Sequence, residues 1–137
     1  PRPFPPPPLA RTREQAAMTL VAQLLVGLVA AQHLGFLVLE MFLWNTPRGR
    51  ASFGATPGFA PQGATLAANP GLDHGLRSAG LVWSLVAHDP VGFPAKVFFL
   101  VCVIIAGLYG ATTVTKRILL IQAVPAVLAR AAVLLSR

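Results

Sequence analysis

Five ionisable side chains stand inside otherwise apolar stretches of this sequence, and together they could bind a proton, a cation or a small polar ligand. His33 and Glu40 are seven residues apart in one apolar run, and Asp73, His74 and Arg77 lie close together in another. Seven residues make about two helical turns, so His33 and Glu40 share one helix face. An ionisable group inside an apolar span is costly, so it usually has a partner or a function.

The second group adds a face of its own. Asn69, Asp73 and Arg77 are spaced i, i+4, i+8, which places them on one side of a helix, where Asp73 can pair with Arg77. Glu40 is a second possible acceptor for Arg77. The candidate polar cluster consists of His33, Glu40, Asn69, Asp73, His74, Arg77, Tyr109 and Gln122.

The elements that carry these residues are long apolar runs. The first, 18–44, is long enough to cross a bilayer, because a helix rises about 1.5 Å per residue and the hydrocarbon core is roughly 30 Å thick. We therefore predict an all-α fold, a four-helix transmembrane bundle over 18–137 with an N-terminal Pro-rich extended arm over 1–17. The spans are expected at about 18–44, 69–87, 95–115 and 118–135. Alternating spans bring the cluster into one leaflet.

Composition agrees with a membrane location. Of the 137 residues, 55% are hydrophobic and 11% are charged, whereas soluble domains average about 25% charged residues. The net charge of +7 comes from Lys and Arg scattered between apolar runs, which argues against nucleic-acid binding and is typical of loops beside membrane helices. We expect a multi-pass membrane protein, with the lipid bilayer as its surroundings. The single Cys102 is interpreted as a packing residue.

Small residues and prolines predict how the helices meet. Gly71 and Gly75 form a GxxxG pair, and Gly107 with Gly110 opens a groove in the third span. The stretch 45–65, rich in Pro and Gly, predicts an ordered or re-entrant loop, and Pro125 is expected to kink the fourth span.

The N-terminal PRPFPPPP is expected to be a polyproline II arm, not a signal peptide. Its residues Pro3, Phe4 and Pro5 are the candidate contacts for a partner protein.

Three interpretations of the cluster stay open. The polar groups either neutralise each other and fix helix register, or form a cavity for a substrate, proton or lipid headgroup, or hold a metal through His33, His74, Glu40 and Asp73. No HxxxH or ExxH pair on one helix supports the metal site, and no catalytic motif is present. We predict no catalytic residues, no cofactor and no metal, and expect that the protein is not an enzyme.

Several segments together resemble a family of small bacterial integral-membrane proteins of unknown function with four predicted spans. The matching stretches are HLGFLVLEMFLWNTPRGRASFG (33–54), LAANPGL (66–72), AGLVW (79–83), FFLVCVIIAGLYGATTVTKRIL (98–119) and IQAVPAVLA (121–129). The resemblance implies four helices and a multi-pass location in the bacterial inner (cytoplasmic) membrane, and no activity. Family members usually carry an acidic residue where this chain has Gln32, and something like NQGLYNGF where it has NPGLDHGL. These departures, with the added arm, favour recruitment as a structural subunit.

Two functions from different classes follow. The first is a non-catalytic accessory subunit of a larger bacterial membrane complex, of respiratory or photosynthetic type, which predicts the other subunits as partners. The alternative is a small transporter or ligand-binding membrane protein that uses Glu40, Asp73 and Arg77. A weaker third is a membrane enzyme acting on a lipid or quinone, for which His33, Glu40 and His74 are the available acid-base groups.

Overall fold

The chain folds entirely into helices in the part that the structure describes. This computed structural model describes residues 3–4 and 8–137, and no strand occurs among them. The elements are α1 (Pro8–Leu37), the π-helical turn η1 (Val38–Phe42), α2 (Pro47–Phe53), α3 (Ala60–Val86), α4 (Gly92–Thr113), the π-helical turn η2 (Leu119–Ala123) and α5 (Val124–Leu135).

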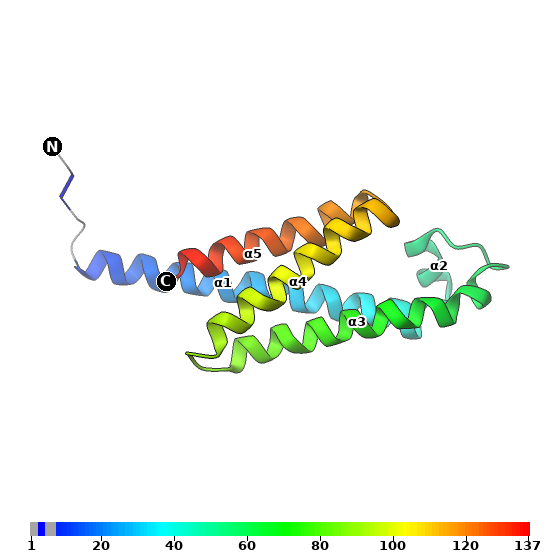
Figure 1. Ribbon diagram of the computed structural model, residues 1–137, viewed down its shortest axis with the longest axis horizontal. Helices are drawn as coiled ribbons and strands as arrows, with labels where there is room; N and C mark the ends of the chain where they lie inside the picture. The colour runs from blue at the N-terminus through cyan, green and yellow to red at the C-terminus, as the bar shows by residue number, and fades with distance from the viewer. Residues whose placement is uncertain (1–2, 5–7) are drawn as a thin grey trace.

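Four long helices run antiparallel to their sequence neighbours and form one bundle (Figure 1). α1 packs against α3 and α5, and α4 packs against α3 and α5. The short α2 lies at the end where α1 passes into α3, and the tight turn between α3 and α4 lies at the opposite end (Figure 1). The N-terminal part of α1 extends beyond the bundle, on the side where α5 ends.

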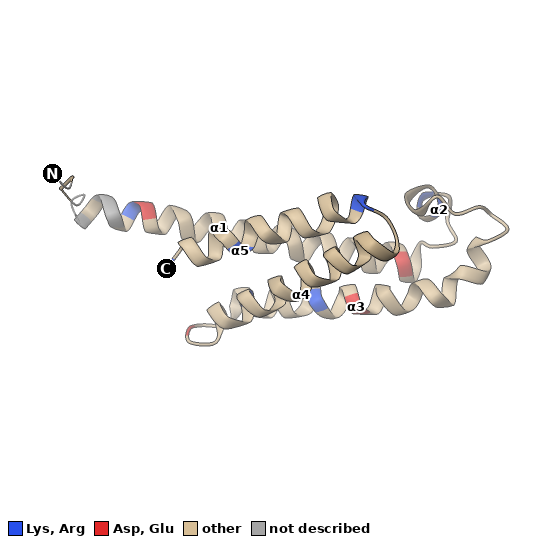
Figure 2. Cartoon of the chain, turned by 45° about the horizontal axis from the view of Figure 1, so that its top comes forward, with Lys and Arg blue, Asp and Glu red and all other residues tan. Residues whose placement is uncertain are grey.

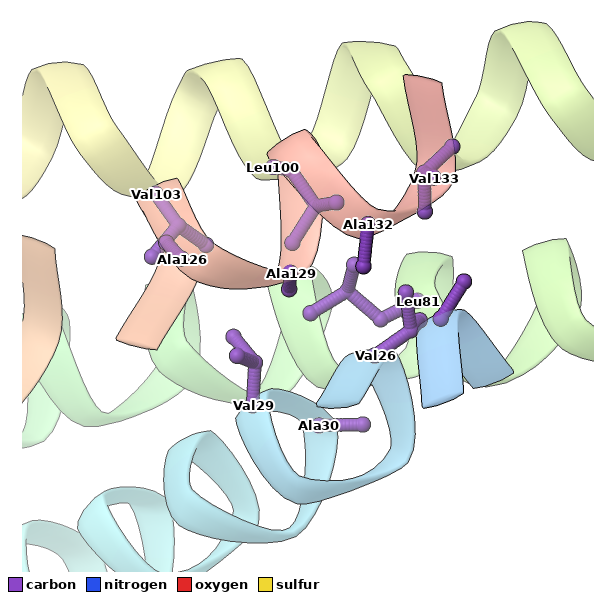
Figure 3. Close-up of a cluster of buried hydrophobic side chains, with 11 residues drawn as sticks. Val26, Val29, Ala30, Leu81, Leu100, Val103, Ala126, Ala129, Ala132 and Val133 are labelled. Atoms are coloured by element: carbon purple, nitrogen blue, oxygen red, sulfur yellow. The ribbon is translucent and has the colours of Figure 1, made fainter. Parts of the chain in front are cut away.

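The core lies where the four long helices meet (Figure 3). On α1 the buried positions recur every three or four residues, as they must on one helix face. Val26 and Val29 of α1, Leu81 of α3, and Leu100 and Val103 of α4 are all fully buried, and small residues of α5 close the cluster. The close approach of α5 therefore depends on alanines.

The outside of the bundle is strongly apolar. Large aliphatic and aromatic side chains are exposed on all four long helices. The segments Thr12–Phe42 and Gly92–Thr113 are long and apolar enough to cross a membrane. Figure 2 shows that most of the bundle carries no charged residues, and that the charged residues lie near the helix ends and in the middle of α3. Four spans were expected, and these two segments are the ones with the required length and apolarity among the described residues. α3 carries polar residues in its middle, and the fourth apolar segment, Leu119–Leu135, is shorter.

The expected boundary of the N-terminal arm at residue 17 is wrong, because α1 already begins at Pro8. Proline is tolerated in the first turn of a helix, where its missing N–H has no intrahelical acceptor, and the stretch that follows contains good helix formers. Pro3 and Phe4 are non-helical and Phe4 is exposed. Pro5 and the rest of the polyproline stretch before Pro8 lie outside the described residues.

The loop expected between the first two spans contains helical structure. α2 is capped by Thr46, whose hydroxyl accepts a hydrogen bond from the Gly49 N–H, and it ends at Gly54, which has a φ of +65°. α3 begins at Ala60, nine residues before the predicted start at residue 69. Tertiary contacts explain the extension, because the Trp44 indole N–H donates to the Ala60 carbonyl at 2.9 Å.

Two π-helical turns interrupt the first and fourth spans. In η1 the Leu43 N–H bonds to the carbonyl of Val38, five residues back, and in η2 the Val124 N–H bonds to that of Leu119. The second turn directly precedes Pro125, where a kink was expected. Each turn holds one extra residue relative to an α-helix, and π turns often occur at functional sites.

The four glycines predicted to pack helices all face another part of the chain. A Cβ on Gly71 would meet the Cγ of Met41 at 2.8 Å, and a Cβ on Gly75 would overlap the Leu37 side chain. On α4, a Cβ on Gly107 would lie 3.1 Å from the backbone nitrogen of Ala123, and Gly110 faces Ile118. The glycines let α1 approach α3, and α4 approach η2.

Replacing Gly107 with leucine is expected to lower the free energy of unfolding by about 1–3 kcal/mol, because the Ala123 backbone cannot move aside. The measurement is the midpoint of unfolding of the purified protein in mixed micelles of increasing SDS content. Gly35→Leu is the matched control, since nothing lies within 4 Å of a Cβ at that position. Equal midpoints for the two variants would show that the close approach at Gly107 is unimportant.

Candidate functional site

The site lies between α1 with η1 and α3, which run antiparallel with a regular register. Ser78 of α3 donates a hydrogen bond to the Ala30 carbonyl at 2.8 Å, and further along the pair Gly71 lies against Glu40 and Met41. Trp44 then packs over Gly63 at the far end of the contact. Because Gly71, Gly75 and Ser78 face α1, His74, which lies between the two glycines on the same face, also points inward.

Glu40 and His74 form the centre of the site. Nδ1 of His74 donates to Oε2 of Glu40 across 2.7 Å, and this is the one ion pair among the side chains that the structure describes. The Glu40 residue is 9% exposed, and the His74 side chain is 14% exposed. A hydrogen bond to a charged acceptor in such a setting is strong, so the carboxylate fixes the orientation of the imidazole.

His33 lies beside this pair and is fully buried. Its ring meets that of His74 edge-on at a centroid distance of 5.4 Å, and that of Phe36 at 5.7 Å. Nδ1 of His33 is 2.8 Å from the Val29 carbonyl. A carbonyl only accepts, so Nδ1 carries the hydrogen and Nε2 presents a lone pair. That Nε2 is buried and has no hydrogen-bond partner in the described part of the chain.

Two further polar contacts join the second π turn, η2, to the rest of the bundle. The side-chain amide of Gln32 donates to the carbonyl of Ile121 in η2, while its own Oε1 is buried without a partner. Gln122, in the same turn, donates to the Val103 carbonyl of α4 at 3.3 Å. These amides thus tie η2 to α1 and to α4.

The structure brings together part of the predicted cluster. His33, Glu40 and His74 meet, whereas Gln122 is buried against α4, where it bonds to the Val103 carbonyl. The expected pairing of Asp73 with Arg77 is absent among residues 3–4 and 8–137, and Glu40 pairs with His74 instead of Arg77. The cluster members that lie exposed on the surface are Asn69, Asp73 and Tyr109.

Two contributors were missed by reasoning from the sequence. Ser78 fixes the α1–α3 register through its bond to the Ala30 carbonyl. Phe36 packs its ring 5.2 Å from that of His74. The spacing of His74 and Ser78 by one helical turn, in phase with the Gly71–Gly75 pair, was the signal that could have identified the inward face of α3.

The arrangement could hold a proton or accept a hydrogen bond. A histidine oriented by a carboxylate is a common proton acceptor, and the free Nε2 of His33 is an acceptor nearby. No three His, Cys, Asp or Glu side chains in the described ranges are placed to hold a metal ion together. Two surface cavities, of about 410 and 500 Å³, are lined by other residues.

Comparison with known proteins gives one match. A family model described as "Protein of unknown function (DUF1304)" matches residues 27–134, from the middle of α1 almost to the end of α5. No curated protein and no solved structure matches the chain. The match covers the whole polar cluster and leaves out the part of α1 that extends beyond the bundle.

Proposed function

Because this chain belongs to the DUF1304 family, whose function is unknown, we propose its function from its own geometry: it is a non-catalytic accessory subunit of a larger bacterial membrane complex. We place it in the inner membrane with four spans, α1, α3, α4 and η2–α5. The host complex is of respiratory or photosynthetic type. Larger membrane subunits are then its partners.

The apolar exterior supports the membrane location. α4 has 22 residues, about 33 Å of helix, which matches a hydrocarbon core of roughly 30 Å. α3 and α5 run beside α1 and α4, so they cross with them. Polar side chains of α3 and of η2 point inward, as with His74 and Gln122, while the outer faces of α3 and α5 carry exposed leucines and valines.

One observation favours a subunit over a free-standing protein: Asp73 is exposed near the middle of α3. A carboxylate facing lipid at this depth is costly, whereas a partner helix that donates hydrogen bonds to it removes the cost. Asn69, one turn away, is exposed on the same face. The large exposed side chains Leu72 and Leu76 supply apolar contact beside them.

The test is a mild-detergent pull-down of the tagged full chain, analysed by quantitative mass spectrometry. We expect wild type to bring down a stoichiometric set of larger membrane subunits, and Asp73→Leu to lose at least about 90% of them, a tenfold effect equivalent to roughly 1.4 kcal/mol. Because Asp73 is exposed, the variant still folds. Glu14→Leu, which removes an exposed carboxylate from the N-terminal part of α1, is the control and retains the partners.

Recovery of wild type alone under these conditions would refute the accessory role. Retention of every subunit by Asp73→Leu would refute the placement of the contact on α3.

A second candidate function has one specific observation in its favour. The unpartnered Nε2 of buried His33, next to the Glu40–His74 pair, is suited to a protein that binds or moves a proton or a small polar ligand. In that case Glu40→Gln abolishes ligand binding or transport and leaves the set of co-purified subunits unchanged. Asp73→Leu, in contrast, leaves binding or transport intact and loses the subunits. The accessory role is preferred because Glu40 and His74 already satisfy each other.

A further inference from the structure

A cavity of about 410 Å³ lies at the end of the bundle opposite η1 and α2, away from the Glu40–His74 pair. It is formed where the start of the buried part of α1, the α3–α4 turn and the end of α5 meet. Its polar lining comes from Thr19, Gln23, His88, Lys96, Ser136 and Arg137. Its volume falls within the range of about 300–1,000 Å³ that small-molecule sites occupy.

Two cations of the lining are held in place. Nζ of Lys96 donates to the Ser84 carbonyl at 2.7 Å, which positions the ammonium group at the end of α3 and leaves N–H capacity for a ligand. The Arg137 guanidinium carbon lies 3.7 Å from the centroid of the Phe93 ring. Stacking leaves the edge of the guanidinium plane available for hydrogen bonds.

The acidic residue of the lining is already engaged. Oδ1 of Asp89 accepts the backbone N–H of Phe93 at 3.1 Å, at the start of α4. The cavity thus combines two cations with one carboxylate that serves a helix end. The remaining wall, with Leu85 and Val133, is apolar. A ligand with a phosphate group and an attached apolar part matches this lining, because cations and hydroxyls bind phosphate and the wall accepts the rest.

We propose that this cavity binds the phosphate of an anionic phospholipid headgroup, such as phosphatidylglycerol. The depth of the cavity agrees, since it lies beside the first turns of α4, where the apolar segment Gly92–Thr113 begins and where headgroups lie in a bilayer. The glycerol hydroxyls of the headgroup find partners in Gln23, Thr19 and Ser136. The inference rests on the membrane location in the proposed function and is independent of any partner subunit.

Native mass spectrometry of the detergent-solubilised full chain, titrated with phosphatidylglycerol, tests the site. Wild type is expected to bind one phosphatidylglycerol about tenfold more tightly than phosphatidylcholine, and the Lys96→Met, Arg137→Gln double variant to lose about tenfold in affinity. The control removes two charges at the opposite end of the bundle, through Lys116→Gln and Arg117→Gln, and leaves binding unchanged. Arg137→Gln alone, which keeps the Lys96 hydrogen bonds, weakens binding even if the double variant fails to fold.

Three results would overturn the proposal. Equal binding of phosphatidylcholine shows that the site has no preference for anionic lipid. Competition by inorganic phosphate at equal concentration shows that free phosphate, and not the headgroup, is the ligand. Unchanged binding in Arg137→Gln and in the folded double variant shows that the lipid binds elsewhere. The membrane location, on which this proposal rests, is tested separately by washing membranes with alkaline carbonate. Extraction of the chain by this wash would refute the membrane location itself.

Discussion

Replacing Glu40 with alanine is expected to lower the free energy of unfolding by about 3 kcal/mol, the largest effect of any single polar substitution in this chain. Removal of the carboxylate leaves the Nδ1–H of His74 without its acceptor in the bundle interior, beside the already unpartnered Nε2 of His33. It also opens space next to Gly71, which packs against the Glu40 side chain. The measurement is the shift in the unfolding midpoint in SDS mixed micelles.

Two controls separate charge from hydrogen bonding and from position. Glu40→Gln keeps an oxygen that can accept from His74, so it should lose less than half as much stability as the alanine variant. Asp73→Asn changes an exposed carboxylate to an amide and should shift stability by no more than about 0.5 kcal/mol. A loss in Asp73→Asn as large as that in Glu40→Ala would contradict the assignment of Glu40, and not Asp73, to the interior.

The second large effect is expected in the core. Leu100 is 0% exposed and belongs to the hydrophobic core, to which all four long helices contribute side chains (Figure 3). Leu100→Ala leaves a cavity that the alanine-rich face of α5 cannot fill, and it should cost about 2–5 kcal/mol. Leu108 is the matched control on the same helix, since it is 52% exposed.

Unfolding midpoints of the two leucine variants, measured side by side, check this prediction. The unfolding midpoint of Leu108→Ala should remain close to that of wild type, because the Leu108 side chain lies on the outside of the bundle and its removal leaves no internal cavity. Similar losses at both positions would show that the face of α4 that carries Leu100 is not the buried one.

The ends of α4 could be predicted closely from the sequence, in contrast to the start of α1. The third span was expected at 95–115 and α4 occupies Gly92–Thr113, because an unbroken run of Val, Phe, Leu and Ile leaves few alternatives. The start of α3 could not be predicted. Its first turns contain Pro61 and Gly63, and they are helical because Trp44 and Phe59 pack there.

The composition of the site was only partly predictable. Spacing correctly placed Asn69, Asp73 and Arg77 on one face of α3, but the rotation of that helix about its axis decides which face meets α1. The glycines Gly71 and Gly75 set the rotation, which turns His74 inward and Asp73 outward, although the two are adjacent. The partner of Glu40 is therefore His74, a choice that depends on packing and not on charge.

The extra residue in η1 changes which side of the helix faces the rest of the bundle. The residues before the turn and those from the turn onward therefore face inward at different angles around one continuous helix. Up to His33 the buried positions of α1 follow one azimuth, which serves both α3 and α5. From the π turn onward the inward-facing positions lie at a different azimuth, so that Glu40, within the turn, is directed at His74, and Trp44, after it, at Ala60. If the same five residues were wound as α-helix, with no residue deleted, everything after them would be rotated by about 100°, the turn of one α-helical residue. The π-helical winding of residues 38–42 is thus as much a part of the site as the residues themselves.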